Sequence, residues 1–209
     1  SPAVPELAAT LLLVTATGSR LREVLTSPER TVAVLAVSED GRHATPLRLS
    51  DDPPPKPTSE LVSHLAVLAA ARRSGRSGQR AIVHTHPDEL IVLTHDPALE
   101  TENELTQRLW SMIPEARLLL SEGVGLVRYR PPGSDAQAAA TAAALSERPI
   151  VLWDRHGAIA TGEDLEQAFD RIDAANKAAS LYLQARRAGF EPKGLDSDQI
   201  GELERIFFG

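Results

Sequence analysis

The stretch RAIVHTHP, residues 80–87, places two histidines one residue apart at the end of an apolar run, directly before a proline. Alternate side chains of a β-strand point to the same face of the sheet, so His84 and His86 would direct both imidazoles at one point. Pro87 ends the strand because proline has no backbone N–H to donate. The sequence therefore predicts a strand that supplies the first two ligands of a metal site.

The size and charge of the chain limit its fold and its partners. With 209 residues, 42% of them apolar, the chain is long enough for one domain with a packed core. Acidic residues outnumber basic ones by 29 to 22, which argues against nucleic acid or an anionic membrane as a partner. No apolar run approaches the roughly 20 residues of a membrane span, so we expect a cytoplasmic location.

The absence of cysteine restricts any metal site to histidine and carboxylate ligands. A third histidine, His156 in LWDRHG, lies in a predicted turn between two strands. Three imidazoles from two strand ends would bind a divalent ion on one side and leave other positions open for water or substrate, the catalytic pattern. The alternative is that a His-x-His pair on a strand arises by chance.

Hydrophobic patterns and turn residues predict the order of the elements. The predicted strands cover residues 10–20, 31–40, 43–50, 80–86, 116–121 and 125–131, followed by a strand, turn and strand over 149–161. The predicted helices cover residues 60–73, 100–112, 134–147, 163–189 and 196–208. Thr58 and Ser59 offer hydroxyls as caps for the first of these helices.

This order of strands interrupted by helices predicts an α/β fold. We expect a three-layer α/β/α arrangement with a largely antiparallel central sheet whose two faces are covered by helices. The turn EDGR between the second and third strands favours antiparallel pairing.

Four stretches together resemble the class II aldolase/adducin-type family: KPTSELVSHL, AIVHTHPDELIVLTH, EGVG and LWDRHGAIATGEDLEQAFDRIDAANKAA. The motifs P-T-S-E, H-x-H and L-W-x-x-H-G are specific in this order, although each alone would be weak. Within the family, the pattern is most similar to the branch that cleaves L-rhamnulose 1-phosphate. The resemblance implies one class II aldolase-like domain over residues 1–209, which we expect to lack the family's N-terminal segment.

The resemblance implies reversible aldol cleavage of L-rhamnulose 1-phosphate to dihydroxyacetone phosphate and L-lactaldehyde. It assigns Zn²⁺, or another divalent transition metal, to His84, His86 and His156, where the ion would act as a Lewis acid. Glu60 matches the acid that the family uses for proton transfer next to the carbonyl. The alternative for Glu60 is a first-turn acid that is favoured by the helix dipole.

The resemblance also implies a phosphate site and a quaternary structure. The substrate phosphate would lie against Thr17, Gly18, Thr58 and Ser59, because a glycine turn and a helix N-terminus offer N–H groups and hydroxyls to an anion. The alternative is that these residues serve only as turn and cap residues. As in the family, we expect a homotetramer with active sites at subunit boundaries.

Two other functions remain open on the sequence. One is a sugar-phosphate epimerase or dehydratase of the same fold, which would use the same metal with other proton-transfer residues. The other is a non-catalytic, adducin-like interaction domain. Such a domain has no reason to keep three histidines and the acid together, so a measurement of bound metal separates it from the enzymes.

Overall fold

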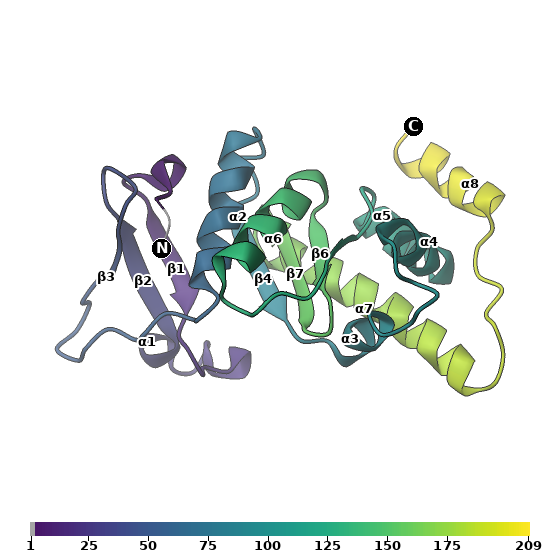
Figure 1. Cartoon of the computed structure of the whole chain (residues 1–209), viewed down its shortest axis with the longest axis horizontal. Coiled ribbons are helices and arrows are strands. Elements are labelled where there is room, and N and C mark those ends of the chain that lie inside the picture. Colours follow the sequence, from purple (N-terminus) through teal and green to yellow (C-terminus); the bar gives the residue numbers. More distant parts are fainter. Residues whose placement is uncertain (1–2) are drawn as a thin grey trace. The chain divides into compact units, whose positions relative to one another are not determined.

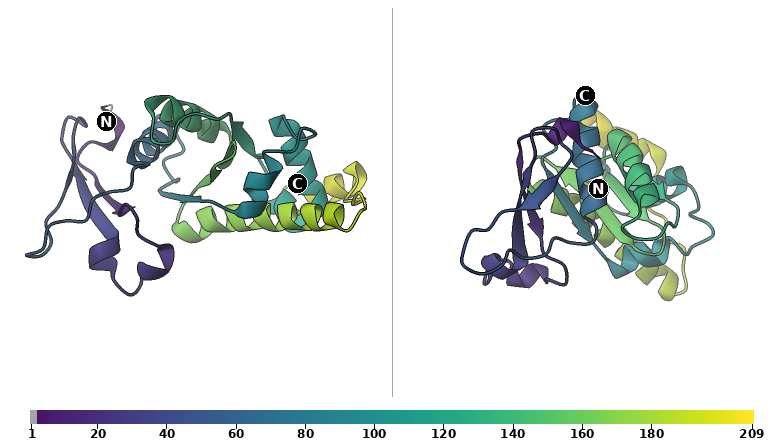
Figure 2. Two further views of the ribbon diagram at one scale, coloured as in Figure 1. Left: turned by 60° about the horizontal axis from the view of Figure 1, so that its bottom comes forward. Right: turned by 60° about the vertical axis from the view of Figure 1, so that its left-hand side comes forward.

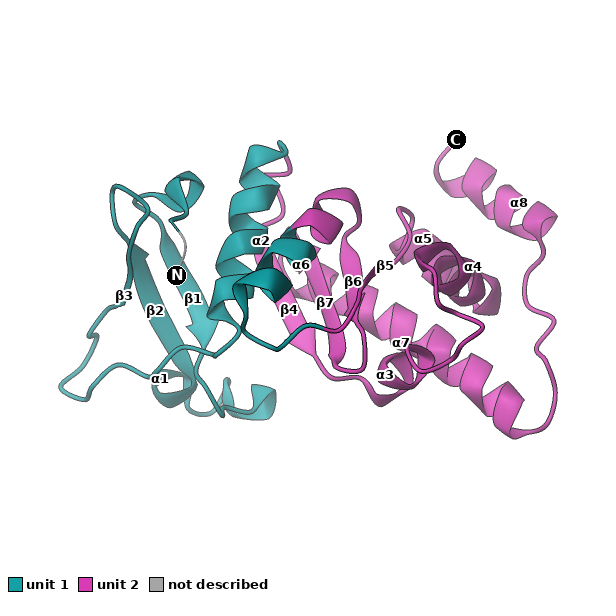
Figure 3. Ribbon diagram, viewed as in Figure 1, with its two compact units in different colours: residues 1–75, 130–142 teal, residues 76–129, 143–209 magenta. Residues whose placement is uncertain are grey.

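The computed structural model describes residues 3–209, which fall into two compact units (Figure 3). The first unit comprises the residues up to 75 together with 130–142, and the second comprises 76–129 and 143–209. Each unit has a β-sheet of its own, so each is described separately.

The first unit is built on an antiparallel sheet with the strand order β1-β2-β3 (Figure 1). Its elements are η1 (Pro5–Leu7), β1 (Leu11–Thr15), η2 (Leu21–Glu23), α1 (Pro28–Thr31), β2 (Val32–Val37), β3 (Ala44–Pro46) and α2 (Leu61–Arg73). Exposure alternates along β2, as expected for a strand with one covered face. That face contributes Val37 to a small core with Leu7 of η1 and Leu65 of α2.

The second unit contains a sheet with the order β4-β7-β6-β5. Its strands are β4 (Ala81–Thr85), β5 (Gly125–Val127), β6 (Ile150–Trp153) and β7 (Gly157–Gly162). Among the strands of residues 3–209, only the pairing of β5 with β6 is parallel. The predicted α/β class and the largely antiparallel pairing are therefore confirmed, and the strands are divided between two sheets.

One long helix covers a face of the second sheet, as Figure 1 and Figure 2 show. The helices of this unit are α3 (Asp88–Leu93), α4 (Glu102–Met112), α5 (Pro114–Leu119), α7 (Leu165–Arg187) and α8 (Ser197–Phe207), and the chain passes from the first unit to the second within α6 (Asp135–Glu147). Alanines 175, 178 and 179 of α7 are fully buried in one core with Leu152 and Ala158 of the sheet. These small side chains let the helix approach the strands closely.

The prediction of a strand at residues 116–121 is wrong, because these residues lie mainly in the helix α5. Pro114 occupies the first turn of α5, where its fixed φ favours a helix, after an extended Ile113. Ala116 and Leu120 are fully buried and four residues apart, which is helical spacing. An apolar run this short does not distinguish a strand from a buried helix.

The helix α3 was not predicted, and β3 is shorter than the predicted strand over residues 43–50. The other predicted helices are confirmed, and Ser134 accepts a hydrogen bond from Gln137 N at 3.2 Å at the start of α6. Within residues 3–209, every helix is too short or too polar to cross a lipid bilayer.

Candidate metal centre

The second unit brings three imidazoles together at one end of its sheet. His84 lies in β4, His86 directly follows this strand, and His156 lies in the turn between β6 and β7. Their possible ligand nitrogens all lie within 4.8 Å of one another. The ring centroids are 4.7 Å apart for His84 and His86, and 5.0 Å apart for His86 and His156. This spacing suits three ligands of one cation.

Strand register explains why the histidines meet. β4 pairs antiparallel with β7, with His84 opposite Ile159, and β7 pairs with β6, with Gly157 opposite Trp153. The short turn between β6 and β7 then returns His156 to the sheet end at which β4 stops. Arg155 adopts a positive φ of 60° in this turn, and its amide donates to Thr94 Oγ1 at 2.9 Å.

A backbone hydrogen bond orients the imidazole of His84. Its Nδ1 lies 2.9 Å from the carbonyl oxygen of Ala158. Because a carbonyl only accepts, Nδ1 carries the proton and donates, and Nε2 is the nitrogen with a lone pair for a cation. The strand that pairs with β4 thus sets the tautomer of its histidine.

The environment of His156 favours the neutral form of its imidazole, which is the form that binds metals. Burial lowers the pKa of His156, and the neighbouring His86 lowers it further. His86 is exposed and the other two are half-buried, so one side of the cluster faces solvent. Three imidazoles with an open side fit a catalytic Zn²⁺ or a similar divalent transition metal.

Two residues that the sequence analysis did not single out complete the centre. Trp153 is 1% exposed, and its ring centroid lies 4.4 Å from that of His84 and 5.0 Å from that of His156. Gly157 lies where a Cβ atom would be 2.9 Å from Cδ2 of His86 and 3.3 Å from Cε1 of His84. Both residues belong to the LWDRHG motif, but their proximity to His84 and His86 follows only from the strand register.

If the three histidines bind a metal as proposed below, Gly157→Ala is expected to weaken binding of Co²⁺ or Zn²⁺ by about 10- to 100-fold, because the new methyl group displaces the rings of His84 and His86. The methyl group would also overlap the Thr85 carbonyl, so the free energy of unfolding should fall by about 1–3 kcal/mol. Titration calorimetry and thermal denaturation of the metal-free protein measure these effects. Gly201→Ala is the control, since a Cβ there meets nothing within 4 Å. Unchanged metal affinity in Gly157→Ala would contradict this view of the site.

The first unit brings together the four residues predicted to bind phosphate. Thr17 N donates to Lys56 O at 2.8 Å, and Thr58 N donates to Thr15 O at 3.0 Å. Between these bonds, Ala16 forms an isolated antiparallel bridge with Pro57. The turn at Thr17 and Gly18 is therefore held beside Thr58 and Ser59.

The same two segments expose groups that suit an anion. Thr17, Gly18 and Ser59 are exposed, and Gly18 has a positive φ of 72° that glycine adopts without strain. The amides of Thr17 and Thr58 already donate to backbone carbonyls. The hydroxyl groups of this segment and the amides of Gly18 and Ser59 are therefore the candidates to donate hydrogen bonds to an anion.

Glu60 lies in the first unit as the N-cap residue of α2, one residue before the helix, and the predicted cap by the Thr58 or Ser59 side chain is not formed. It is half-buried, its amide donates to Thr58 Oγ1 at 3.3 Å, and its carbonyl accepts from His64 N at 3.2 Å. The acid therefore directly follows the two hydroxyl residues Thr58 and Ser59.

A polar hollow of about 380 Å³ adjoins the turn at Thr17. It is lined by Thr17, Gly18, Ser19, Glu23, Ser27, Arg30 and Thr31. The exposed Arg20 instead pairs with Glu23 at 3.5 Å. Sequence reasoning missed Arg30 as a cation near this turn, because the short helix α1 that carries it was not predicted.

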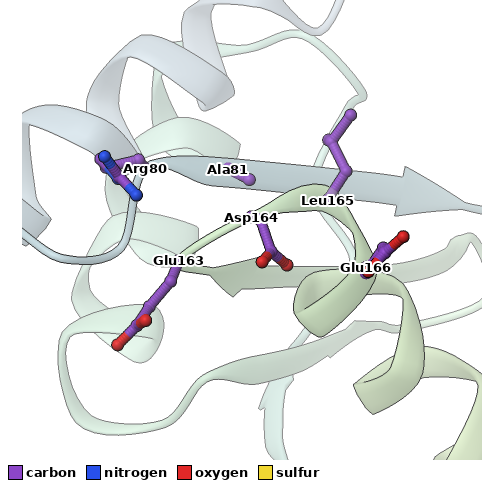
Figure 4. A pocket seen from close by; sticks show the side chains of 6 residues that line it. All are labelled: Arg80, Ala81, Glu163, Asp164, Leu165 and Glu166. Atoms are coloured by element: carbon purple, nitrogen blue, oxygen red, sulfur yellow. The ribbon is translucent and has the colours of Figure 1, made fainter.

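Another hollow, of about 580 Å³, lies at the start of α7 in the second unit (Figure 4). It is lined by Arg80, Ala81, Glu163, Asp164, Leu165 and Glu166. Asp164 caps α7 by accepting from Gln167 N at 2.8 Å. Three carboxylates against one guanidinium repel a phosphate, so this hollow does not suit a sugar phosphate.

The remaining histidines do not belong to the cluster of three. His43 and His95 are exposed, and His64 is half-buried. Burial lowers the pKa of His64 to about 4, so its imidazole is neutral at pH 7.

Comparison with known proteins reveals a family match over most of the chain. The family model described as "Class II Aldolase and Adducin N-terminal domain" matches residues 4–183. The rhamnulose-1-phosphate aldolase of Bacteroides thetaiotaomicron is 38% identical over 191 residues, covering 91% of this chain and 70% of that protein. The rhamnulose-1-phosphate aldolase of Mannheimia succiniciproducens is 32% identical, covering 98% of this chain and 74% of that protein.

A solved structure has the same fold. The crystal structure of a sugar-phosphate aldolase from Thermotoga maritima matches with a TM-score of 0.76 at 33% sequence identity. The match covers 88% of this chain and 75% of the Thermotoga maritima chain.

Proposed function

Because the chain belongs to the class II aldolase and adducin family, we propose that it is a metal-dependent aldolase acting on a ketose 1-phosphate. The first candidate substrate is L-rhamnulose 1-phosphate, which would give dihydroxyacetone phosphate and L-lactaldehyde. The proposal is carried by the three imidazoles of His84, His86 and His156, whose ligand nitrogens lie within 4.8 Å of one another with one side open.

The three histidines would hold Zn²⁺ or another divalent transition metal. When bound, the cation supplies positive charge for the substrate oxygen that becomes negative as the carbon–carbon bond breaks. The contact between His84 Nδ1 and Ala158 O keeps the ligand nitrogen oriented before substrate arrives. This preorganisation favours stabilisation of charge in the transition state.

Residues of the first unit would bind the phosphate and move a proton. The hydroxyls of Thr17, Thr58 and Ser59, with the amide of Gly18, would hold the phosphate of the substrate. In cleavage, the bond between C3 and C4 breaks, the C4 hydroxyl gives its proton to solvent water as it becomes the aldehyde, and the electron pair of the bond moves towards the ketone. Glu60 would return a proton to C3 and complete dihydroxyacetone phosphate.

A coupled assay of dihydroxyacetone phosphate release tests this function. The panel contains L-rhamnulose 1-phosphate, L-fuculose 1-phosphate and D-fructose 1-phosphate, and NADH oxidation by glycerol-3-phosphate dehydrogenase reports the product. We expect release from at least one ketose, abolished by EDTA and restored by Zn²⁺. Conversion of a sugar phosphate without release would favour an epimerase or dehydratase, and no bound metal would favour an interaction domain.

We also propose that the chain works in the cytoplasm as a homotetramer, in line with its resemblance to the family. Sedimentation velocity at working concentration measures the assembly. A tetramer is the expected result, and a monomer would contradict it.

A further inference from the structure

We propose that Trp153 is a positioning residue whose indole holds the imidazoles of His84 and His156 in the arrangement that binds the cation. This inference rests on the metal-binding part of the proposed function. It concerns a residue that is not itself a ligand.

The indole contacts two ligands that come from different elements. Its ring lies 4.4 Å from the ring of His84 in β4, with an interplanar angle of 42°, and 5.0 Å from that of His156 in the β6–β7 turn, at 38°. Trp153 is 1% exposed, so packing fixes its own rotamer. One rigid side chain thus limits the rotation of two ligand rings.

The strand register explains how an indole from β6 reaches a histidine in β4. Trp153 is paired with Gly157 on the intervening strand β7, and His84 is paired with Ile159, two residues further along β7. Paired and alternate residues share one face, so both side chains lie on the same face. Because Gly157 has no side chain, the indole can extend across β7 at that point.

His156 depends on this contact more than His84 does. The Nδ1 of His84 is held by Ala158 O at 2.9 Å. Within residues 3–209, the ring nitrogens of His156 make no hydrogen bond to another residue, and its ring neighbours are His84, His86 and Trp153. Ligands that are loose before metal arrives bind it more weakly, because their rotation must be restricted on binding.

The first test compares Trp153→Leu with Trp153→Phe in Co²⁺ titrations of the metal-free protein. Trp153→Leu removes the aromatic wall and should raise the dissociation constant for Co²⁺ by about 10- to 100-fold. It should also change the visible absorption bands of bound Co²⁺, which report ligand geometry. Trp153→Phe keeps a ring and should recover most of the affinity.

Leu152→Ala is the matched control for lost packing. Leu152 is fully buried and adjacent, but it pairs with Ala158 on the opposite face and belongs to the core under α7. This variant should lose stability and keep the Co²⁺ affinity and spectrum of the parent. Equal loss of affinity in Leu152→Ala and Trp153→Leu would overturn the proposal, as would an unchanged spectrum and affinity in Trp153→Leu.

A second measurement does not depend on whether Trp153→Leu folds. The chain has two tryptophans, and Trp110 lies in α4 with its Nε1 donating to Leu120 O at 2.9 Å. In Trp110→Phe, the remaining emission belongs to Trp153 and should be quenched in proportion to bound Co²⁺. If Co²⁺ binds without quenching, the positioning role fails while the metal site stands. If the parent binds no Co²⁺, the proposed function itself fails.

Discussion

His84→Ala should lose the metal and, with it, catalytic activity. The substitution removes a proposed ligand whose tautomer is set by the backbone, through Nδ1 and Ala158 O at 2.9 Å. Losing even a residue that orients a ligand costs about 10- to 100-fold in affinity, so losing a ligand should cost more than about 100-fold. Because several kcal/mol of charge stabilisation depend on the ion, kcat/KM should fall by about a thousandfold or more.

Metal content after dialysis and the coupled cleavage assay measure these two effects together. His95→Ala is the control, because His95 belongs to the same unit, is exposed and is not a member of the cluster. The control should keep both metal and activity. A His84→Ala protein that still carries one tightly bound ion would remove His84 from the ligand set.

Unlike His84→Ala, which should lose the metal, Glu60→Ala should keep the metal and lose the chemistry. This variant should bind metal nearly as tightly as the parent, while cleavage slows by about 100- to 10,000-fold, the usual contribution of a positioned acid or base. The half-buried side chain of Glu60 lies at the start of α2, next to Thr58 and Ser59, so it adjoins the proposed phosphate donors.

Metal analysis and single-turnover cleavage distinguish proton transfer from ion binding. Glu39→Ala, an exposed acid between β2 and β3 of the same unit, serves as the control. Loss of the ion in Glu60→Ala, with the chemistry unaffected once excess metal is added, would reverse the assignment of roles.

Local signals in the sequence predicted the parts of the molecule that depend on local chemistry. Hydrophobic spacing predicts helices over residues 100–112 and 163–189, and α4 and α7 lie within these two ranges. That the side chains of His84 and His86 point to the same face of the sheet follows from the two-residue period of a strand alone. Their meeting with His156 needed only a short turn between two strands.

Features that depend on register and tertiary context escaped the sequence analysis. The apolar run Leu118–Leu120 by itself fits a strand or a helix, and Pro114 in the first turn together with the burial of Ala116 and Leu120 favours α5. The proximity of Trp153 to His84 depends on the pairing of Trp153 with Gly157 and of His84 with Ile159 along β7, which no local pattern reveals. The division of the strands between two sheets is likewise a matter of long-range pairing.

The most direct test of the metal centre is X-ray absorption at the zinc edge on protein loaded with one equivalent of Zn²⁺ per chain. Because the ligand nitrogens of the three imidazoles lie close to one another, we expect a full equivalent of bound zinc. Three histidine nitrogens should then lie about 2.0–2.1 Å from the zinc ion. A chain that binds no zinc, or binds it through fewer than three histidines, would contradict the account.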